Sequence, residues 1–140
     1  MIDKLTKLQR SSNMARVHSR DTAPELFVRR EIFAEGFRYR IAPKLAGKPD
    51  IVLSRYRTAV FVHGCFWHGH SCARGARPKS NTEFWDRKLA KNIERDARAV
   101  CLLESQGWTV VTIWTCQLSA GTSALIRRLR SLRRQRDAPQ

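Results

Sequence analysis

The stretch DIVLSRYRTAVFVH, residues 50–63, carries the strongest fold signal in this chain. Two runs rich in β-branched residues, 50–53 and 58–63, flank a polar segment at 54–55. Runs of this kind, close together across a polar turn, predict an antiparallel β-hairpin. Asp50, one of the few acidic residues in a basic chain, stands at the start of the first strand.

A helix precedes this hairpin. The sequence Thr-Ala-Pro-Glu at 22–25 combines a capping box with a proline in the first turn, and Gly36 is a suitable C-terminal stop. We therefore expect a helix over residues 23–35. Residues 37–41 form a candidate short strand before the hairpin.

Beyond the hairpin the pattern changes to a long loop and then to helix, strand and helix. An irregular loop is expected at 64–82. A loop this long inside a compact domain usually has a function. Helical periodicity predicts a long helix at 83–106, and a last helix is expected at 122–135. Between them, the nearly continuous apolar run at 108–114 predicts a buried strand. The expected apolar stripe of the long helix consists of Trp85, Leu89, Ile93, Ala97 and Val100, and Cys101 is interpreted as a core residue. This order predicts an α/β or α+β domain with a mixed central β-sheet flanked by helices.

Composition points to a basic protein with one core. Of 140 residues, 27 are Lys or Arg and 12 are Asp or Glu, so the formal net charge is +15. So large a charge predicts a polyanionic partner, and an RNA-binding protein, a nuclease or a ribosomal protein would all fit. We expect a flexible basic arm at 1–20, a single domain at 21–136 and a tail at 137–140.

The same composition excludes a membrane-spanning protein, since no apolar run approaches roughly 20 residues. Residues 1–10 lack the apolar core of a signal peptide. We therefore expect a cytoplasmic protein, in which four cysteines favour metal binding or core packing over a disulfide framework.

Cysteine and histidine residues cluster in the expected loop. Cys65, His70 and Cys72 lie within eight residues, and 43 residues separate Cys72 from Cys116. A Cys3His set completes the tetrahedral shell of a structural zinc ion, which would tie the loop to the end of the strand at 108–114. The other interpretation is a set of free thiols and a surface histidine.

Other candidate residues each have two interpretations. Asp50 either hydrogen-bonds its own turn or binds Mg²⁺ against a phosphodiester. The capping role explains Glu25 fully, and an indirect contact with a water molecule or a metal ion would be additional. His63 and His68 are either surface imidazoles or proton-transfer groups.

The aromatic residues near this loop are equally open. Phe66 and Trp67 either cover the core or act as a wedge between DNA bases. Core packing is favoured for Trp85, which lies on the expected apolar stripe.

Seven stretches together resemble the very-short-patch repair endonucleases, which have a restriction-endonuclease-like fold. They follow the family order across about residues 10–116. The stretches are RSxNM (10–14), DTAPE (21–25), GKPD (47–50), VHGCFWHGHSC (62–72), TEFW (82–85), KNIERD (91–96) and GWxVxxxWxC (107–116).

The resemblance implies a role for each matching residue. Asp50 and the backbone carbonyl of Val62 would bind Mg²⁺, and His68 would activate the attacking water with support from His63 and Glu25. The implied structural zinc ligands are Cys65, His70, Cys72 and Cys116. The implied DNA-intercalating residues are Phe66, Trp67 and Trp85, which replaces the core interpretation of Trp85. The implied DNA-contacting residues are Met14, Lys88, Lys91 and Asn92.

The resemblance also implies an activity. The expected protein is a Mg²⁺-dependent DNA endonuclease that nicks one strand on the 5′ side of the thymine in a T·G mismatch left by deamination of 5-methylcytosine. This would start very short patch repair in the cytoplasm of a bacterial-type cell, at the nucleoid. We expect a monomer whose partners are mismatched double-stranded DNA and accessory mismatch-repair proteins. Two alternatives are a nuclease of the same fold that cuts matched DNA in defence, and a non-catalytic zinc module that binds nucleic acid by charge.

Overall fold

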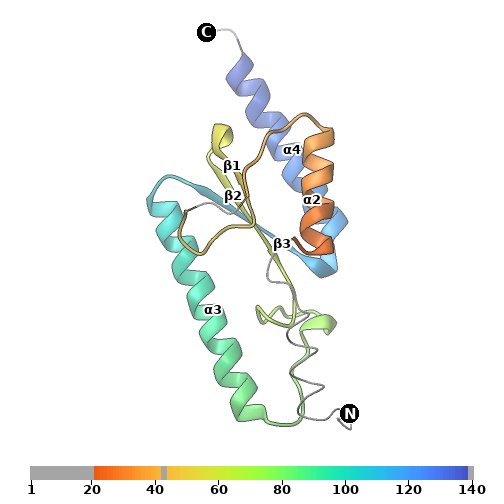
Figure 1. The fold of residues 1–140 in the computed structure, drawn as a ribbon, viewed down its shortest axis with the longest axis vertical. Helices are drawn as coiled ribbons and strands as arrows, with labels where there is room; N and C mark the ends of the chain where they lie inside the picture. The colour runs from red at the N-terminus through yellow and green to blue at the C-terminus, as the bar shows by residue number, and fades with distance from the viewer. Residues whose placement is uncertain (1–20, 42–43, 139–140) are drawn as a thin grey trace.

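A computed structural model describes residues 21–41 and 44–138 of the chain (Figure 1). The expected arm at 1–20 and the last two residues of the expected tail lie outside this range. The elements in chain order are α2 (Ala23–Ala34), β1 (Ile51–Leu53), β2 (Thr58–His63), α3 (Thr82–Ser105), β3 (Thr109–Trp114) and α4 (Leu118–Asp137). Among the described helices, none is long and apolar enough to span a membrane.

The three strands form the mixed sheet expected from the sequence. β1 pairs with β2 in antiparallel fashion, with Ile51 opposite Val60. β2 pairs with β3 in parallel, with His63 opposite Trp114 at the ends of the two strands. The strand order is β1-β2-β3, so β2 is central and every residue of it is buried. The predicted hairpin is confirmed.

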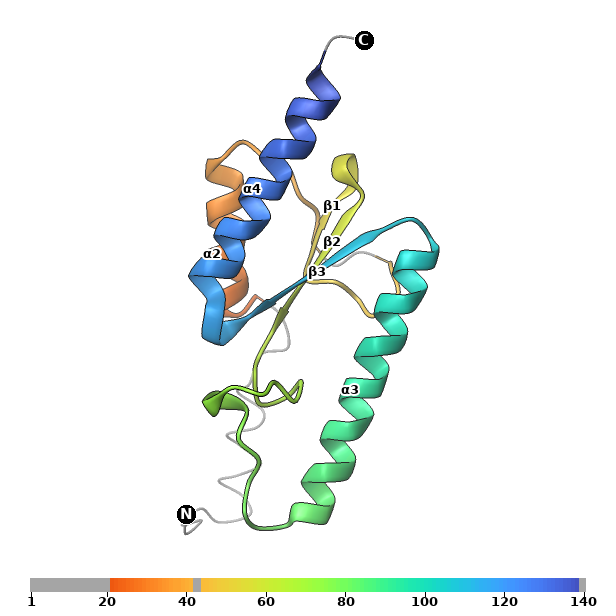
Figure 2. The same ribbon diagram turned by 180° about the vertical axis from the view of Figure 1, so that it is seen from behind.

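Helices cover both faces of this sheet. α2 and α4 lie together on one side and α3 lies on the other, as the two opposite views show (Figures 1 and 2). The larger core cluster includes Val60 and Val62 of β2 with residues of α2 and α4. The smaller cluster joins Ala59 and Phe61 of β2 to Leu103 of α3. Because successive side chains of a strand point to opposite faces, β2 contributes to both cores.

Local signals set both ends of α2. The Thr22 side chain accepts a hydrogen bond from the Glu25 N–H at 3.4 Å, as the capping motif requires. At the other end the Gly36 N–H donates to the Phe33 carbonyl and the Phe37 N–H to the Ile32 carbonyl, which is a Schellman motif. Gly36 has φ +87°, a conformation that favours glycine. The predicted helix at 23–35 is confirmed to within one residue.

The predicted strand at 37–41 is wrong. Within it the structure has a single bridge, Arg40 to Val52, and no strand. The Phe37 N–H is occupied by the end of α2, and the Phe37 side chain is buried in the larger core cluster. This end of the segment therefore closes the helix instead of extending the sheet.

The bounds of α3 are confirmed, but its predicted apolar stripe is largely wrong. The buried residues are Leu89, Ala99 and Leu103, whereas Ile93 is 39% exposed and Cys101 is exposed. Only one end of α3 packs on the sheet, and the rest extends past it (Figure 1). Helical periodicity shows which residues share a face, but it does not show where the sheet stops.

Two smaller expectations also differ. β3 lies at one edge of the described sheet, so five of its six residues are only partly buried, although a buried strand was expected. The last helix begins at Leu118, about four residues before the predicted start at 122.

Candidate active site

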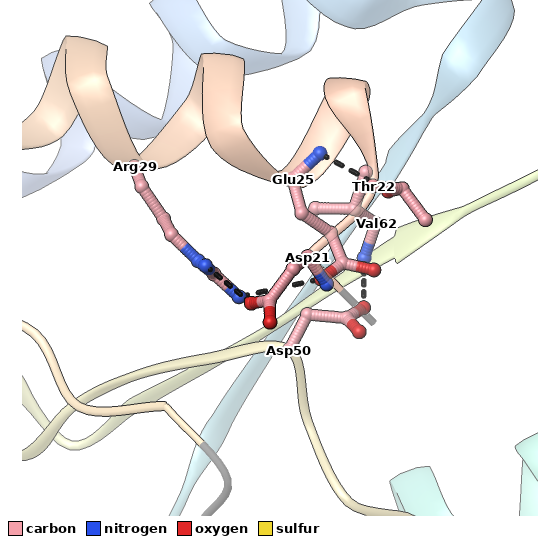
Figure 3. A network of polar contacts seen from close by, with 6 residues as sticks. All are labelled: Asp21, Thr22, Glu25, Arg29, Asp50 and Val62. Atoms are coloured by element: carbon pink, nitrogen blue, oxygen red, sulfur yellow. Dashed lines mark hydrogen bonds and ion pairs between the residues drawn. The ribbon is translucent and has the colours of Figure 1, made fainter. Parts of the chain in front are cut away.

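The first group of site residues surrounds Asp50, at the point where β1 begins. The Asp50 side chain accepts a hydrogen bond from the Val62 N–H at 2.7 Å (Figure 3). This contact extends the β1–β2 pairing by one more hydrogen bond, because the Asp50 carboxylate accepts from the Val62 N–H where a backbone carbonyl would do so in a longer strand. The N–H and C=O of one strand residue face the same neighbour in an antiparallel pair, so the Val62 carbonyl is directed toward the same side as Asp50.

Glu25 lies beside Asp50 and is only 3% exposed. Its carboxylate accepts hydrogen bonds from the Asp21 N–H at 2.9 Å and from the Arg29 guanidinium at 3.4 Å. Arg29 also pairs with the Asp21 carboxylate at 2.8 Å. The capping role expected for Glu25 is therefore real, although the reciprocal donor is Asp21 and not Thr22. Glu25 is held by this network with its carboxylate near that of Asp50 (Figure 3).

The electrostatics of this group suit a cation. The pKa of Asp50 is raised from 3.8 to about 6. Burial is the largest cause and the neighbouring Glu25 adds to it, against the lowering effects of the Val62 N–H and Arg29. Two acidic groups held close together, with a carbonyl nearby, are the oxygen donors that Mg²⁺ prefers. Asp50 and its neighbours could therefore hold a divalent cation such as Mg²⁺.

The second group joins His63, His68 and Asp96. The two imidazole rings stack with centroids 3.7 Å apart and planes 2° from parallel. The Asp96 carboxylate of α3 lies 2.5 Å from Nδ1 of His68. This hydrogen bond fixes the ring and favours a proton on Nδ1, which leaves the lone pair of Nε2 free to accept a proton.

His63 has a different environment. It is 7% exposed, and burial, together with the neighbouring His68, lowers its pKa below the ordinary value of 6.5. The donor atoms of His63, His68 and Asp96 are close enough for a metal site. However, a metal ion bound to imidazole lies near the ring plane, so two parallel stacked rings cannot share one ion. This arrangement suits proton transfer.

Sequence reasoning assigned no role to Asp96. It lies within the matching stretch at 91–96 and one helical turn after Asn92, so the two residues share a face of α3. That periodicity is the signal that could have identified it. Its partner His68 is 28 residues away in the chain, which no local pattern reveals.

The third group is the Cys/His cluster, and the structure brings its four members together. The donor atoms of Cys65, His70, Cys72 and Cys116 all lie within 4.8 Å of one another. The Thr115 hydroxyl lies 3.5 Å from Cys65 Sγ. Three sulfur atoms and one imidazole nitrogen are a donor set typical of a closed tetrahedral site. These residues could hold a metal ion that joins loop 64–81 to the end of β3.

A close approach in the loop supports this cluster. A Cβ atom at Gly75 would overlap the carbonyl oxygen of His70. Only glycine allows the loop to fold back this tightly behind His70.

The expected wedge residues form one aromatic cluster. Phe66 lies 5.1 Å from Trp67 and 5.3 Å from Trp85, measured between ring centroids. All three are partly exposed, so none of them lies in the core. The side-chain amide of Asn92 donates to the Trp67 carbonyl at 3.0 Å, which ties the loop to α3.

The remaining expected DNA contacts divide between described and undescribed residues. Lys88 and Lys91 are exposed on α3. Met14 lies outside the described residues.

One cavity of about 1040 Å³ joins the first two groups. It is lined by Asp50 and Glu25 on one side and by His63, His68 and Asp96 on the other. Trp67 of the aromatic cluster also reaches it, and its basic lining residues are Lys48, Arg95 and Arg98. The structure therefore places all four predicted catalytic residues around one space that basic side chains also line.

An acidic pair, a histidine oriented by a carboxylate, and basic side chains around one cavity in a strongly basic chain suit a DNA endonuclease. Comparison with known sequences agrees. The family model described as DNA mismatch endonuclease Vsr matches residues 2–74. The chain belongs to this family, the very-short-patch repair endonucleases, and is a DNA mismatch endonuclease of restriction-endonuclease-like fold.

Individual relatives cover most of the chain. The type II nicking enzyme V.NmeAIP of Neisseria meningitidis serogroup A is 48% identical over 139 residues, 99% of both chains. The type II nicking enzyme V.XorIIP of Xanthomonas oryzae pv. oryzae is 43% identical over 133 residues, 94% of this chain and 97% of that enzyme. The DNA mismatch endonuclease Vsr of Escherichia coli is 41% identical over 119 residues, 84% of this chain and 76% of that protein.

Proposed function

We propose that this endonuclease nicks one DNA strand on the 5′ side of the thymine in a T·G mismatch produced by deamination of 5-methylcytosine, and so starts very short patch repair. The observation that carries the proposal is the single cavity that joins the Asp50 group to the His68 group, with an aromatic cluster at its edge. The names of the relatives support the proposal in two ways. A mismatch endonuclease supports action at a mismatch, and nicking enzymes support cleavage of one strand.

Asp50 and the Val62 carbonyl would hold Mg²⁺ at the cavity, where the ion would polarise the scissile phosphate. His68 would take a proton from the attacking water at Nε2, and Asp96 would hold the ring in the required orientation and stabilise it when it becomes positive. His63 stacks on His68 and would keep it from rotating. Glu25 would complete the negative environment that attracts the cation.

The Cys/His cluster would hold zinc as a structural ion. Loop 64–81 carries little of the buried core, since Cys65 is its one buried side chain apart from glycine. A zinc ion bound by Cys65, His70, Cys72 and Cys116 would supply the stability that packing does not. The ion would hold His68 and the aromatic residues of the loop near the cavity.

The aromatic cluster would enter the DNA stack. Partial exposure of Phe66, Trp67 and Trp85 leaves their rings available to bases, and insertion of such side chains opens a base step. Lys88, Lys91 and Asn92 on α3, together with Met14, would contact the DNA beside them. The protein would act as a monomer, with mismatch-repair accessory proteins as candidate partners.

A nicking assay tests this proposal. End-labelled duplexes with a T·G mismatch and with a T·A pair would be incubated with Mg²⁺ or with EDTA. We expect a single-strand nick 5′ of the mismatched thymine that requires Mg²⁺. Cutting of the matched duplex would favour a defence nuclease, and binding without cutting in several sequence contexts would favour a non-catalytic module.

A further inference from the structure

Four aromatic rings lie in a row between the Cys/His cluster and the catalytic cavity. His70 stacks on Trp114 with centroids 4.3 Å apart and planes at 22°. Trp114 meets His63 edge-on at 5.4 Å, and His63 stacks on His68 at 3.7 Å. The row therefore begins at a metal-binding candidate and ends at the expected proton acceptor.

The sheet explains why these rings meet. His63 and Trp114 are register partners at the ends of the parallel strands β2 and β3. Cys116, two residues after Trp114, contributes a sulfur atom to the cluster, and its Sγ lies 3.5 Å from Nδ1 of His70. The end of β3 and the residues just after it thus supply Cys116 to the Cys/His cluster and the Trp114 ring, which contacts both His70 and His63.

We propose that Trp114 is a positioning residue through which the metal-bound loop holds the catalytic histidine pair. An ion on Nδ1 of His70 constrains the plane of that ring, because the lone pair that it uses lies in the plane. Stacking then restricts Trp114, and the edge of Trp114 restricts His63 and, at 6.5 Å, His68. The expected effect of Trp114 on catalysis rests on the proposed role of His68. The mechanical coupling between His70 and the His63–His68 pair does not depend on that role.

Asp96 also holds His68, through the hydrogen bond to Nδ1. A hydrogen bond at one atom still allows the ring to tilt about that contact. Packing against His63, which in turn contacts Trp114, removes this remaining freedom. Misplacement of a catalytic group by about 1 Å is enough to lower a rate about 100-fold.

Substitutions at Trp114 test the role in catalysis. Trp114→Leu keeps an apolar side chain but removes the ring, and Trp114→Phe keeps a ring. Val111→Ala is the matched control, because Val111 lies on the same strand and packs on the larger core without being part of the row of rings.

For Trp114→Leu we expect kcat for nicking to fall about 10-fold or more while the Kd for mismatched DNA stays within about 2-fold. Trp114→Phe should recover most of kcat, and Val111→Ala should lower Tm without lowering kcat. Release of zinc to a chromophoric chelator should be faster for Trp114→Leu than for Trp114→Phe. Wild-type kcat and wild-type zinc release in a folded Trp114→Leu protein would overturn the proposal.

A measurement on the unaltered sequence covers the case in which Trp114→Leu does not fold. Imidazole ¹⁵N spectra would be compared for protein loaded with Zn²⁺ and with the larger cation Cd²⁺. The exchange should shift the signals of His63 and His68 as well as those of His70. A shift confined to His70 would refute the coupling. This spectrum does not depend on nicking, so a failure of the proposed function would be recognised separately, by the absence of a nick with wild-type protein.

Discussion

Replacement of Asp50 by asparagine should stabilise the metal-free protein while it abolishes nicking. The pKa of Asp50 is about 6 in the folded protein, against 3.8 for the unperturbed group. Burial is the main cause, so the ionised carboxylate of Asp50 opposes folding at neutral pH when no cation is bound. A difference of about two pKa units corresponds to roughly 3 kcal/mol.

The direction of the pH dependence follows from proton binding. Between pH 3.8 and about 6 the folded state binds the proton of Asp50 more tightly than the unfolded state does. The contribution of Asp50 to stability is therefore present below pH 3.8, is lost as the pH rises through this window, and changes little above it. An asparagine side chain at this position would have no such proton, so the two proteins should differ most above pH 6.

Asparagine can still accept the hydrogen bond from the Val62 N–H, although as a neutral and weaker acceptor. We therefore expect Asp50→Asn to be about 2 kcal/mol more stable at pH 7.5, with Tm higher by about 7 °C in a domain of this size. The measurement is urea and thermal unfolding of both proteins in Mg²⁺-free buffer from pH 4 to pH 8. Contributions from groups that both proteins share cancel in the difference.

Asp86→Asn is the control, because Asp86 is an exposed acid on α3 whose ion pair with Arg77 lies at the surface. It should change stability by about 0.5 kcal/mol or less, in the destabilising direction. Added Mg²⁺ should raise the stability of the wild type and leave Asp50→Asn unchanged. An Asp50→Asn protein that is no more stable than the wild type at pH 7.5, or a gain that is equal at pH 4 and pH 8, would refute the electrostatic reasoning.

Three further changes test the other parts of the site. Cys116→Ser should remove a metal ligand and lower the free energy of unfolding by roughly 3 kcal/mol with loss of bound zinc; unchanged zinc content by elemental analysis would contradict this. Asp96→Asn should lower kcat about 100-fold with Tm changed by only a few degrees, because the carboxylate that orients His68 is lost; a wild-type rate in single-turnover nicking would exclude that role. Gly75→Ala should destabilise the protein by about 2 kcal/mol and speed zinc release, since the added methyl group meets the His70 carbonyl; equal thermal unfolding curves would disprove the overlap.

The sequence by itself determined the local parts of this protein. The hairpin of β1 and β2, the Thr22 cap and the Gly36 stop of α2, and the bounds of α3 all follow from residues a few positions apart, where side-chain periodicity and backbone sterics decide the conformation. The four members of the Cys/His cluster could also be named from the sequence, because few other roles explain that combination of residue types.

Only the tertiary structure decided which residues face each other across the site. Asp50 meets Glu25 and His68 meets Asp96 because a strand end, a loop and two helices converge there, and no periodicity encodes a distance between separate elements. The same limit explains the errors. Cys101 is exposed because it lies on the face of α3 that is turned away from the sheet, although Ala99 and Leu103 beside it are buried. β3 is half-buried because it lies at an edge of the described sheet. Burial depends on what packs against a residue, and that is a property of the assembled fold.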